Sequence, residues 1–235
     1  MYQIEKLVSA SHVGNDRRLT LSAAVDFMQD CSFFQINSLS KLMAEFVQKN
    51  MAMYVISRQM DILDMPQFND QLIVRTWVWN LNNLFGSRNT VIYDQNGTPK
   101  VISYAMGAFV DLNSGQAATI SDDVEKDILI EEKLDMEYLP RKIKLPDVSP
   151  TELKPIAVLK SHIDLYNHVN NAKYIMVASD LLPADFQTKR MRVEYKIPAK
   201  QGDVFFPLFY EMENKVIVSL NNQAGETYAV VEFWK

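Results

Sequence analysis

The chain has 235 residues, of which 48% are hydrophobic and 23% charged, a balance typical of a globular protein and unlike that of a disordered one. Its net charge of −5 and the lack of a recognisable nucleic-acid-binding motif argue against nucleic acid as a partner. No apolar run reaches the about 18 residues that a membrane-spanning helix needs, and the first residues lack the pattern of a secretory signal. A single cysteine, Cys31, excludes an internal disulfide and fits a reducing compartment. We therefore expect a cytoplasmic protein without membrane insertion.

A long helix is predicted over residues 20–46, where apolar side chains recur at helical spacing. Its other side is apolar too and includes Cys31 and Phe34. This apolar surface is wider than a helix resting on a single layer needs. We therefore expect a curved sheet to enclose the helix.

Strand candidates follow the helix at 73–80, 87–93 and 101–110, with a hairpin signal at Asp94-Gln95-Asn96-Gly97. After them comes a charged stretch from Ser121 that contains several prolines. This composition predicts a linker with one short helix near 122–134.

The second half of the chain repeats the first. Ser161-His162-Ile163 echoes Ser11-His12-Val13 at an offset of 150 residues. A helix is predicted over 169–182, and the strand candidates that follow it in the same order are 203–210, 215–220 and 227–234. We expect an α+β protein with two repeats, at 1–120 and 151–235, joined by a linker at 121–150.

The repeats differ at one place that matters for chemistry. When they are superposed on the shared triplets, Gly14 falls opposite Asp164 and Arg18 opposite His168. Spacing alone favours a capping or turn role for such an Asp and a structural role for such a His. His12 and His162, in what read as strand-like segments, are interpreted as structural.

The segment Asp164-Leu165-Tyr166-Asn167-His168-Val169-Asn170-Asn171-Ala172-Lys173-Tyr174 resembles the D-x-N-x-H-V-N-N-x-x-Y motif of acyl-acyl-carrier-protein (acyl-ACP) thioesterases, of the bacterial type. Single-repeat acyl-CoA thioesterases also place an Asp four residues before the His of H-V-N-N. Arg17 to Ser22 resembles the family's R-x-L-T-L-S, and Thr76 to Gly97 its T-W…R…D-x-x-G. The resemblance covers nearly the whole chain.

The resemblance implies a tandem, or double, hotdog fold, in which each repeat is a curved antiparallel β-sheet wrapped around a central α-helix. It implies hydrolysis of fatty acyl thioesters, foremost acyl-ACP, with release of the free fatty acid that ends fatty acid synthesis. The first repeat would hold a degenerate site and part of the substrate pocket. No cofactor or metal is implied. The acidic acyl carrier protein is the expected partner, and the protein is expected to be a monomer or homodimer.

The resemblance also assigns residues. Asp164 and His168 would be catalytic, in a family whose active site is described as an Asp, Asn, His and Glu set. Tyr166 stands where plant-type members have the Asn, and Pro198 where they have the Glu. Glu194 is a speculative substitute for that Glu.

Backbone amides near Asn170 and Asn171 are candidates for stabilising the oxyanion of a thioester, because a helix N-terminus offers free N–H groups. Two functional alternatives stay open. One is an acyl-CoA thioesterase, and the other is a catalytically weak or inactive module that binds acyl chains or docks the carrier.

Basic residues cluster near the end of the chain and suggest steering of an acidic carrier, with a solvated face as the alternative. They are Lys189, Arg190, Arg192, Lys196 and Lys200. Three further arginines, Arg58, Arg75 and Arg88, are interpreted as solvated strand residues or members of ion pairs. The acyl chain length is not encoded in any local pattern.

Overall fold

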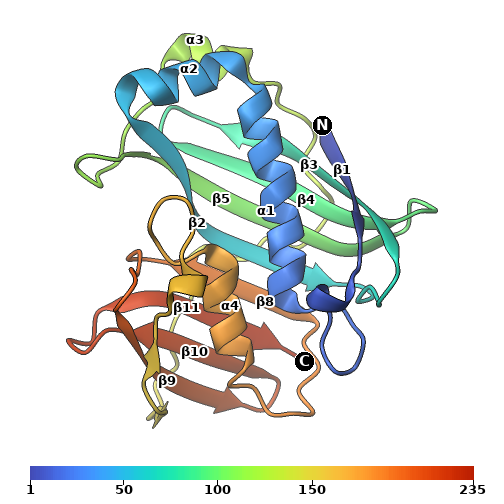
Figure 1. Cartoon of the computed structure of the whole chain (residues 1–235), viewed down its shortest axis with the longest axis vertical. Helices are drawn as coiled ribbons and strands as arrows, with labels where there is room; N and C mark the ends of the chain where they lie inside the picture. Colours follow the sequence, from blue (N-terminus) through green and yellow to red (C-terminus); the bar gives the residue numbers. More distant parts are fainter. The chain divides into compact units, whose positions relative to one another are not determined.

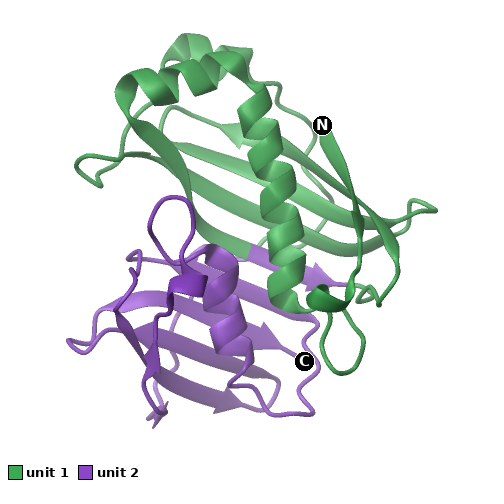
Figure 2. Ribbon diagram, in the orientation of Figure 1, with its two compact units in different colours: residues 1–58, 63–138 green, residues 59–62, 139–235 purple.

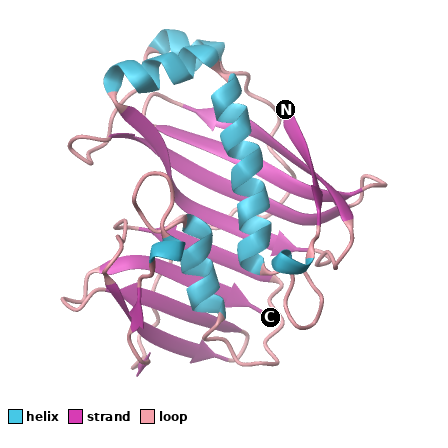
Figure 3. Ribbon diagram, in the orientation of Figure 1, coloured by secondary structure: helices cyan, strands magenta, loops and turns pink.

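The computed structural model describes residues 1–235 and divides into two compact units (Figure 2). The first unit contains residues 1–58 and 63–138, and the second contains residues 59–62 and 139–235. Each unit is a curved β-sheet with a helix across one face, as Figures 1 and 3 show. No helix is both long and apolar enough to span a lipid bilayer.

The sheet of the first unit has the strand order β1-β3-β4-β5-β2. Its strands are β1 (Tyr2–Leu7), β2 (Met51–Ile62), β3 (Gln71–Leu81), β4 (Phe85–Asp94) and β5 (Pro99–Asp111). β3, β4 and their partners β1 and β5 pair antiparallel. The predicted hairpin joins β4 to β5, with Gly97 at a φ of 82° and the Asp94 carboxylate accepting the N–H groups of Asn96 and Thr98.

The predicted first helix is two helices, α1 (Leu21–Ser38) and α2 (Ser40–Lys49). Leu39 interrupts them with a ψ of 86°, outside the helical region. The break lets α2 bury Leu42 and Phe46 in an apolar cluster against which Ile36, near the end of α1, also packs. One continuous helix is therefore the wrong prediction.

The buried arc of α1 is wide, as the enclosing sheet requires. Ala24, Val25, Met28 and Cys31 have no exposed surface. Phe34, which the sequence placed on this apolar surface, is instead 49% exposed. The enclosure is confirmed for the buried residues of α1, which also include Phe27.

Much of the stretch predicted as a linker is packed against the first unit. It contains a short helix, α3 (Asp122–Asp127), which ends earlier than expected. Residues beyond it lie on the outer face of the sheet, where Trp77 Nε1 donates to the Glu132 carbonyl at 2.8 Å. The Tyr138 hydroxyl donates to Asn89 Oδ1 at 3.0 Å.

The second unit has the strand order β8-β11-β10-β9-β6, with β7 also pairing with β9. Its strands are β6 (Thr151–Glu152), β7 (Ile156–Ala157), β8 (Arg190–Tyr195), β9 (Val204–Met212), β10 (Lys215–Asn221) and β11 (Thr227–Trp234). Beside β8 lies the end of β2, where the Ile62 N–H donates to the Lys189 carbonyl at 2.7 Å.

The helix of the second unit, α4 (Asn171–Ser179), is shorter than the predicted 169–182. Val169 is held in a β-bridge with Ile163, so it cannot join the helix. Beyond Ser179 the chain makes tighter turns before Pro183, which cannot continue a helix. Ile175 and Ala178 are fully buried, which confirms that the helix is enclosed.

Candidate functional site

The loops that precede α1 and α4 have the same backbone structure. We call residues 9–20 the first pre-helix loop and residues 159–170 the second. Equivalent N–H···O bonds of 2.8 to 3.0 Å close them: Gly14 to Arg18 and Thr20 to His12 in the first, Asp164 to His168 and Asn170 to His162 in the second. The offset of 150 residues found in the sequence is therefore the true structural register.

The loops also share a left-handed residue, with a φ of 64° at Arg17 and 60° at Asn167. Both begin with a 3-10 turn, η1 (Ala10–His12) and η2 (Lys160–His162), so the two histidines do not lie in strands as predicted. Each histidine ring accepts a backbone N–H through Nδ1, at 3.1 and 3.3 Å respectively. These contacts give both rings a role in holding the loop.

Asp164 occupies the second loop in a defined orientation. Its Oδ1 accepts the N–H of Tyr166 at 2.8 Å and that of His168 at 3.3 Å. This is the local turn role that spacing alone favoured. The other oxygen, Oδ2, takes part in neither bond.

His168 is half-buried beside this carboxylate. Burial, the largest influence, lowers the pKa of the imidazole below 6.5; the Asp164 charge opposes this shift, and the Lys200 charge adds to it. The ring is therefore neutral at neutral pH, the form that can accept a proton.

The start of α4 presents one backbone amide to the same loop. Asn170 caps the helix, since its Oδ1 accepts the Ala172 N–H at 2.8 Å and its carbonyl the Lys173 N–H at 2.8 Å. Its own N–H donates to the His162 carbonyl. The Asn171 N–H, at the first helical position, has no intrahelical partner. Of the two amides predicted for an oxyanion, the one at Asn171 is available.

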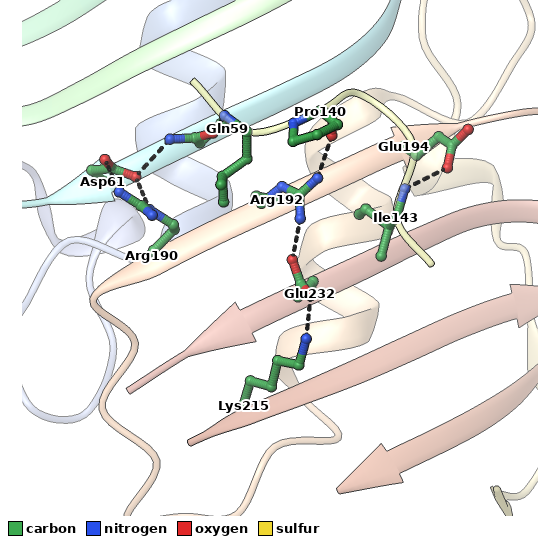
Figure 4. Close-up of polar contacts among 10 residues, drawn as sticks. Gln59, Asp61, Pro140, Ile143, Arg190, Arg192, Glu194, Lys215 and Glu232 are labelled. Atoms are coloured by element: carbon green, nitrogen blue, oxygen red, sulfur yellow. Dashed lines mark hydrogen bonds and ion pairs between the residues drawn. The ribbon is translucent and has the colours of Figure 1, made fainter. Parts of the chain in front are cut away.

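The strand β8 brings Tyr195 to the helix and turns Glu194 away from it. The Tyr195 hydroxyl donates to the Asn171 carbonyl at 3.0 Å, so this side chain faces α4. Neighbouring strand residues point to opposite faces. Glu194 accepts the Ile143 N–H at 3.0 Å on the other face (Figure 4). Arg141 lies 3.7 Å from the Glu194 carboxylate. The suggestion that Glu194 replaces the family's Glu does not agree with this placement.

Tyr166 and Pro198 stand at the positions where the resemblance led us to expect Asn and Glu. Burial raises the pKa of the half-buried Tyr166, so its phenol keeps its proton. Pro198 is exposed and offers no ionisable group. No cluster of three or more His, Cys, Asp or Glu side chains is arranged to hold a metal ion.

Sequence reasoning missed two residues that hold the second loop in place. The Ala199 carbonyl accepts the Val169 N–H at 2.8 Å, and the Ala199 N–H donates to the Tyr174 hydroxyl at 2.8 Å. Burial raises the pKa of Tyr174. The position of Tyr174 at the end of the motif was the available signal, because the hydroxyl of a tyrosine in a buried helix usually finds a hydrogen-bond partner.

The basic cluster is split by ion pairs, as Figure 4 shows. Arg190 contacts Asp61 through two hydrogen bonds of 2.6 and 2.7 Å. Arg192 lies 2.5 Å from Glu232 and also donates to the Pro140 carbonyl. These two arginines are structural, which corrects the expectation that they steer a carrier. The exposed lysines of the cluster are Lys189, Lys196 and Lys200.

Solved structures show the same fold over the whole chain. An acyl-ACP thioesterase from Bacteroides thetaiotaomicron aligns with a TM-score of 0.89 at 22% identity, covering 99% of this chain and 96% of that one. The 12:0-ACP thioesterase from Umbellularia californica aligns with a TM-score of 0.87 at 16% identity, covering 100% and 96%. The predicted double hotdog is thereby confirmed.

Sequence comparison points the same way. The Arabidopsis thaliana protein named oleoyl-acyl carrier protein thioesterase 2, chloroplastic, is 20% identical over 251 aligned positions, covering 96% of this chain and 67% of the relative. The model of the acyl-ACP thioesterase N-terminal domain matches residues 1–128, and that of the C-terminal domain matches residues 147–229. The chain therefore belongs to the acyl-ACP thioesterase family.

Proposed function

We propose that this protein hydrolyses fatty acyl thioesters, with acyl-ACP as its main substrate, and releases the free fatty acid and the carrier thiol. Membership of the family supports this reaction class. We place the site in the second pre-helix loop because its side chains differ from those of the first, although the two loops have the same backbone structure. Only in the second one does a carboxylate, that of Asp164, act on the imidazole of His168 just ahead of the helix N-terminus.

In the proposed reaction, the Asn171 N–H stabilises the oxyanion that forms when the thioester carbonyl is attacked, assisted by the positive end of the α4 dipole. A water molecule adds to the carbonyl carbon and gives a proton to Asp164 or His168. The C–S bond then breaks, and the proton passes to the departing thiolate. Direct attack by Asp164 Oδ2 is the alternative, in which water hydrolyses an acyl-carboxylate intermediate.

These two routes differ in where the oxygen of water first appears. In a single turnover in heavy-oxygen water, base catalysis incorporates the label only into the fatty acid. Direct attack incorporates it into the Asp164 carboxylate when water attacks the intermediate at the Asp164 carbonyl carbon. Label found by mass spectrometry in the peptide that contains Asp164 therefore establishes direct attack.

The experiment that tests the function is a thiol-release assay of the purified chain. Acyl-ACP and acyl-CoA substrates of several chain lengths are compared, with Asp164→Asn as the inactive reference. We expect turnover of acyl-ACP at a higher kcat/KM than acyl-CoA of the same length. The reverse order supports the acyl-CoA alternative, and binding without turnover supports the non-catalytic module.

We propose further that the exposed lysines Lys196 and Lys200 guide the acidic carrier, because the charge of Lys200 reaches His168. Reversing both to Glu is expected to raise KM for acyl-ACP more than for acyl-CoA. Lys144→Glu is the matched control, since Lys144 is exposed and follows Ile143 on the face away from α4. The difference should shrink as salt rises, because the screening length is about 8 Å at physiological ionic strength. Equal changes in KM for both substrates would show that these lysines do not guide the carrier.

We also propose a cytoplasmic location and a monomeric or homodimeric state. Cys31 is buried, and burial raises the pKa of its thiol to about 11, so it is a packing residue in any compartment. Size-exclusion chromatography with light scattering tests the oligomeric state, and larger assemblies would contradict it.

A further inference from the structure

The first turn of α4 contains a peptide group that side chains hold at both ends. The peptide that joins Asn171 to Ala172 donates its N–H to Asn170 Oδ1 at 2.8 Å. Its carbonyl, that of Asn171, accepts the hydroxyl of Tyr195 on β8 at 3.0 Å. Within an α-helix the same oxygen accepts the N–H four residues ahead, so the hydroxyl is a second donor to it. A side chain of the sheet thus bonds to the residue that carries the unbonded N–H.

The first unit shows whether a helix that follows a pre-helix loop needs such a bond. Two equivalent hydrogen bonds give the register: the Val169 N–H donates to the Ala199 carbonyl at 2.8 Å, and the Leu19 N–H donates to the Pro66 carbonyl at 2.7 Å. Ala199 and Pro66 therefore correspond. The residues four positions before them also correspond, and they are the last residues of β8 and β2.

These two strand ends are Tyr195 and Ile62. Ile62 has no hydroxyl to donate. At the start of α1 the cap residue Thr20 accepts the N–H of Ala23, one position later than the N–H that the cap of α4 accepts. A helix therefore begins behind the first loop without a tyrosine hydroxyl at this place, and the fold of the loop does not explain the hydroxyl of Tyr195.

Packing does not explain the hydroxyl either. The Tyr195 ring meets the Tyr174 ring of α4 edge-on, with the centroids 5.7 Å apart, and Tyr174 in turn lies 5.6 Å from the Phe205 ring. A phenylalanine would supply the same ring contact between β8 and α4. The hydroxyl adds a directed bond, which fixes the orientation of the peptide that follows Asn171.

We infer that Tyr195 is a positioning residue, whose hydroxyl orients the Asn171 backbone and so aims the Asn171 N–H at the thioester oxyanion. The inference rests on the proposed function and adds to it a residue that acts through Asn171. An oxyanion donor is effective when it is held in place before the charge develops. A hydrogen bond to the carbonyl of the same residue limits the rotation that would turn this N–H away.

The test compares Tyr195→Phe with the wild type in kcat, KM and pH dependence for acyl-ACP. Because the variant keeps the ring and loses one hydrogen bond, kcat should fall about fivefold with KM nearly unchanged. An equal loss of kcat and kcat/KM marks an interaction that acts in the transition state. The acidic limb of the pH profile should stay in place, because the charges of Asp164 and Lys200, which act on His168, are untouched.

A second measurement does not depend on turnover. In Tyr195→Phe, the Ala172 N–H should exchange with solvent about fivefold faster in NMR, because its peptide has lost the bond at the other end. The Ala23 N–H at the start of α1 is the internal reference and should keep its wild-type rate. A wild-type protein that hydrolyses no thioester would contradict the proposed function, whereas the exchange of Ala172 would still test the hold of Tyr195 on the turn.

The matched control is Tyr138→Phe, which removes a hydroxyl that donates to Asn89 Oδ1 at 3.0 Å in the first unit. It should leave kcat and the exchange of the Ala172 N–H unchanged. Wild-type kcat in Tyr195→Phe, or wild-type exchange of Ala172 in that variant, would overturn the inference. A rise in KM that accounts for the whole loss would also do so, because it would assign the hydroxyl to substrate binding. An equal loss of kcat in Tyr138→Phe would reduce the effect to the general cost of a missing hydroxyl and so contradict the inference.

Discussion

In the two pre-helix loops, carboxylates from different positions accept the equivalent backbone N–H group. In the first loop, Asp16 Oδ1 accepts the N–H of Arg18 at 3.0 Å. In the second, Asp164 Oδ1 accepts the N–H of His168, the equivalent residue, at 3.3 Å. A Cβ added at Gly14 would come within 3.1 Å of the Asp16 carboxylate, so the two positions for the carboxylate compete for the same space.

This comparison separates the needs of the fold from those of catalysis. Either carboxylate holds the turn, so the turn itself does not explain why Asp164 is present. Only the carboxylate at the start of the loop lies beside an imidazole, since the residue opposite His168 is Arg18. The second loop therefore meets the structural requirement and adds the chemical groups.

The largest expected effect comes from exchanging the carboxylates for amides. Asp164→Asn should lower kcat/KM for acyl-ACP at least about tenfold, which corresponds to about 1.4 kcal/mol of transition-state stabilisation. The amide oxygen still accepts the loop N–H groups, so Tm should change little. Asp16→Asn is the matched variant and should leave turnover unchanged. Equal activities of the two variants would contradict the proposal that the second loop contains the active site.

The imidazole position gives a second pair. His168→Ala is expected to lower turnover at least about tenfold as well, because it removes the group that relays or positions the proton. Arg18→Ala, at the equivalent position, should have a much smaller effect on turnover. Circular dichroism confirms that both variants are folded, and an active His168→Ala would exclude this residue from the mechanism.

The capping residues at the ends of the two loops, Thr20 and Asn170, provide a third pair of variants. Thr20 Oγ1 accepts the Ala23 N–H at 3.2 Å, and Asn170 Oδ1 accepts the Ala172 N–H at 2.8 Å. Replacing either cap by Ala should cost about 1 kcal/mol of unfolding free energy, measured by urea denaturation. Asn170→Ala should also reduce turnover, because the cap fixes the backbone that carries the Asn171 amide. A loss of turnover in Thr20→Ala of the same size would contradict this.

The smallest expected effect is a shift in pH dependence. Because burial lowers the pKa of His168, protonation should reduce activity only at a lower pH than it would with an unperturbed imidazole. Lys200→Ala removes a charge that disfavours the imidazolium, so the acidic limb of kcat/KM should move to higher pH. Asp164→Asn removes one that favours it, so the imidazole titration followed by NMR should move to lower pH. Shifts in the same direction would contradict this account.

The free energy of unfolding should also decrease as His168 becomes protonated. The folded state binds the His168 proton less readily than the unfolded state, whose pKa is about 6.5. The contribution of this group is therefore favourable above that value and decreases as pH falls below it, until the folded pKa is passed. Denaturant unfolding of the wild type and His168→Ala across this range measures it.

Local pattern was sufficient to predict the repeat and the loop in which we propose the site. The hairpin at 94–97, the offset of 150 residues and the loop from Asp164 to His168 depend on residues close together in the chain. Turn chemistry and helix periodicity act over a few residues, so a sequence can display them directly. The break at Leu39 could not be read this way, because it depends on the cluster in which α2 buries Leu42 and Phe46 with distant residues such as Phe109 and Ile120.

Tertiary structure decided which charged side chains are available. Arg190 pairs with Asp61, 129 positions away, and Arg192 pairs with Glu232, so a cluster of five cations in the sequence includes only three exposed ones. Glu194 was excluded by the face of β8 on which it lies, and a shift of one residue in strand register would have reversed that. Arg58 and Arg88 are buried rather than solvated, which corrects the expectation from the sequence, and their burial depends on strands that meet only in the folded sheet. Sequence alone determined which groups are present in the loop before α4, whereas pairing across the sheet determined which other groups could join them.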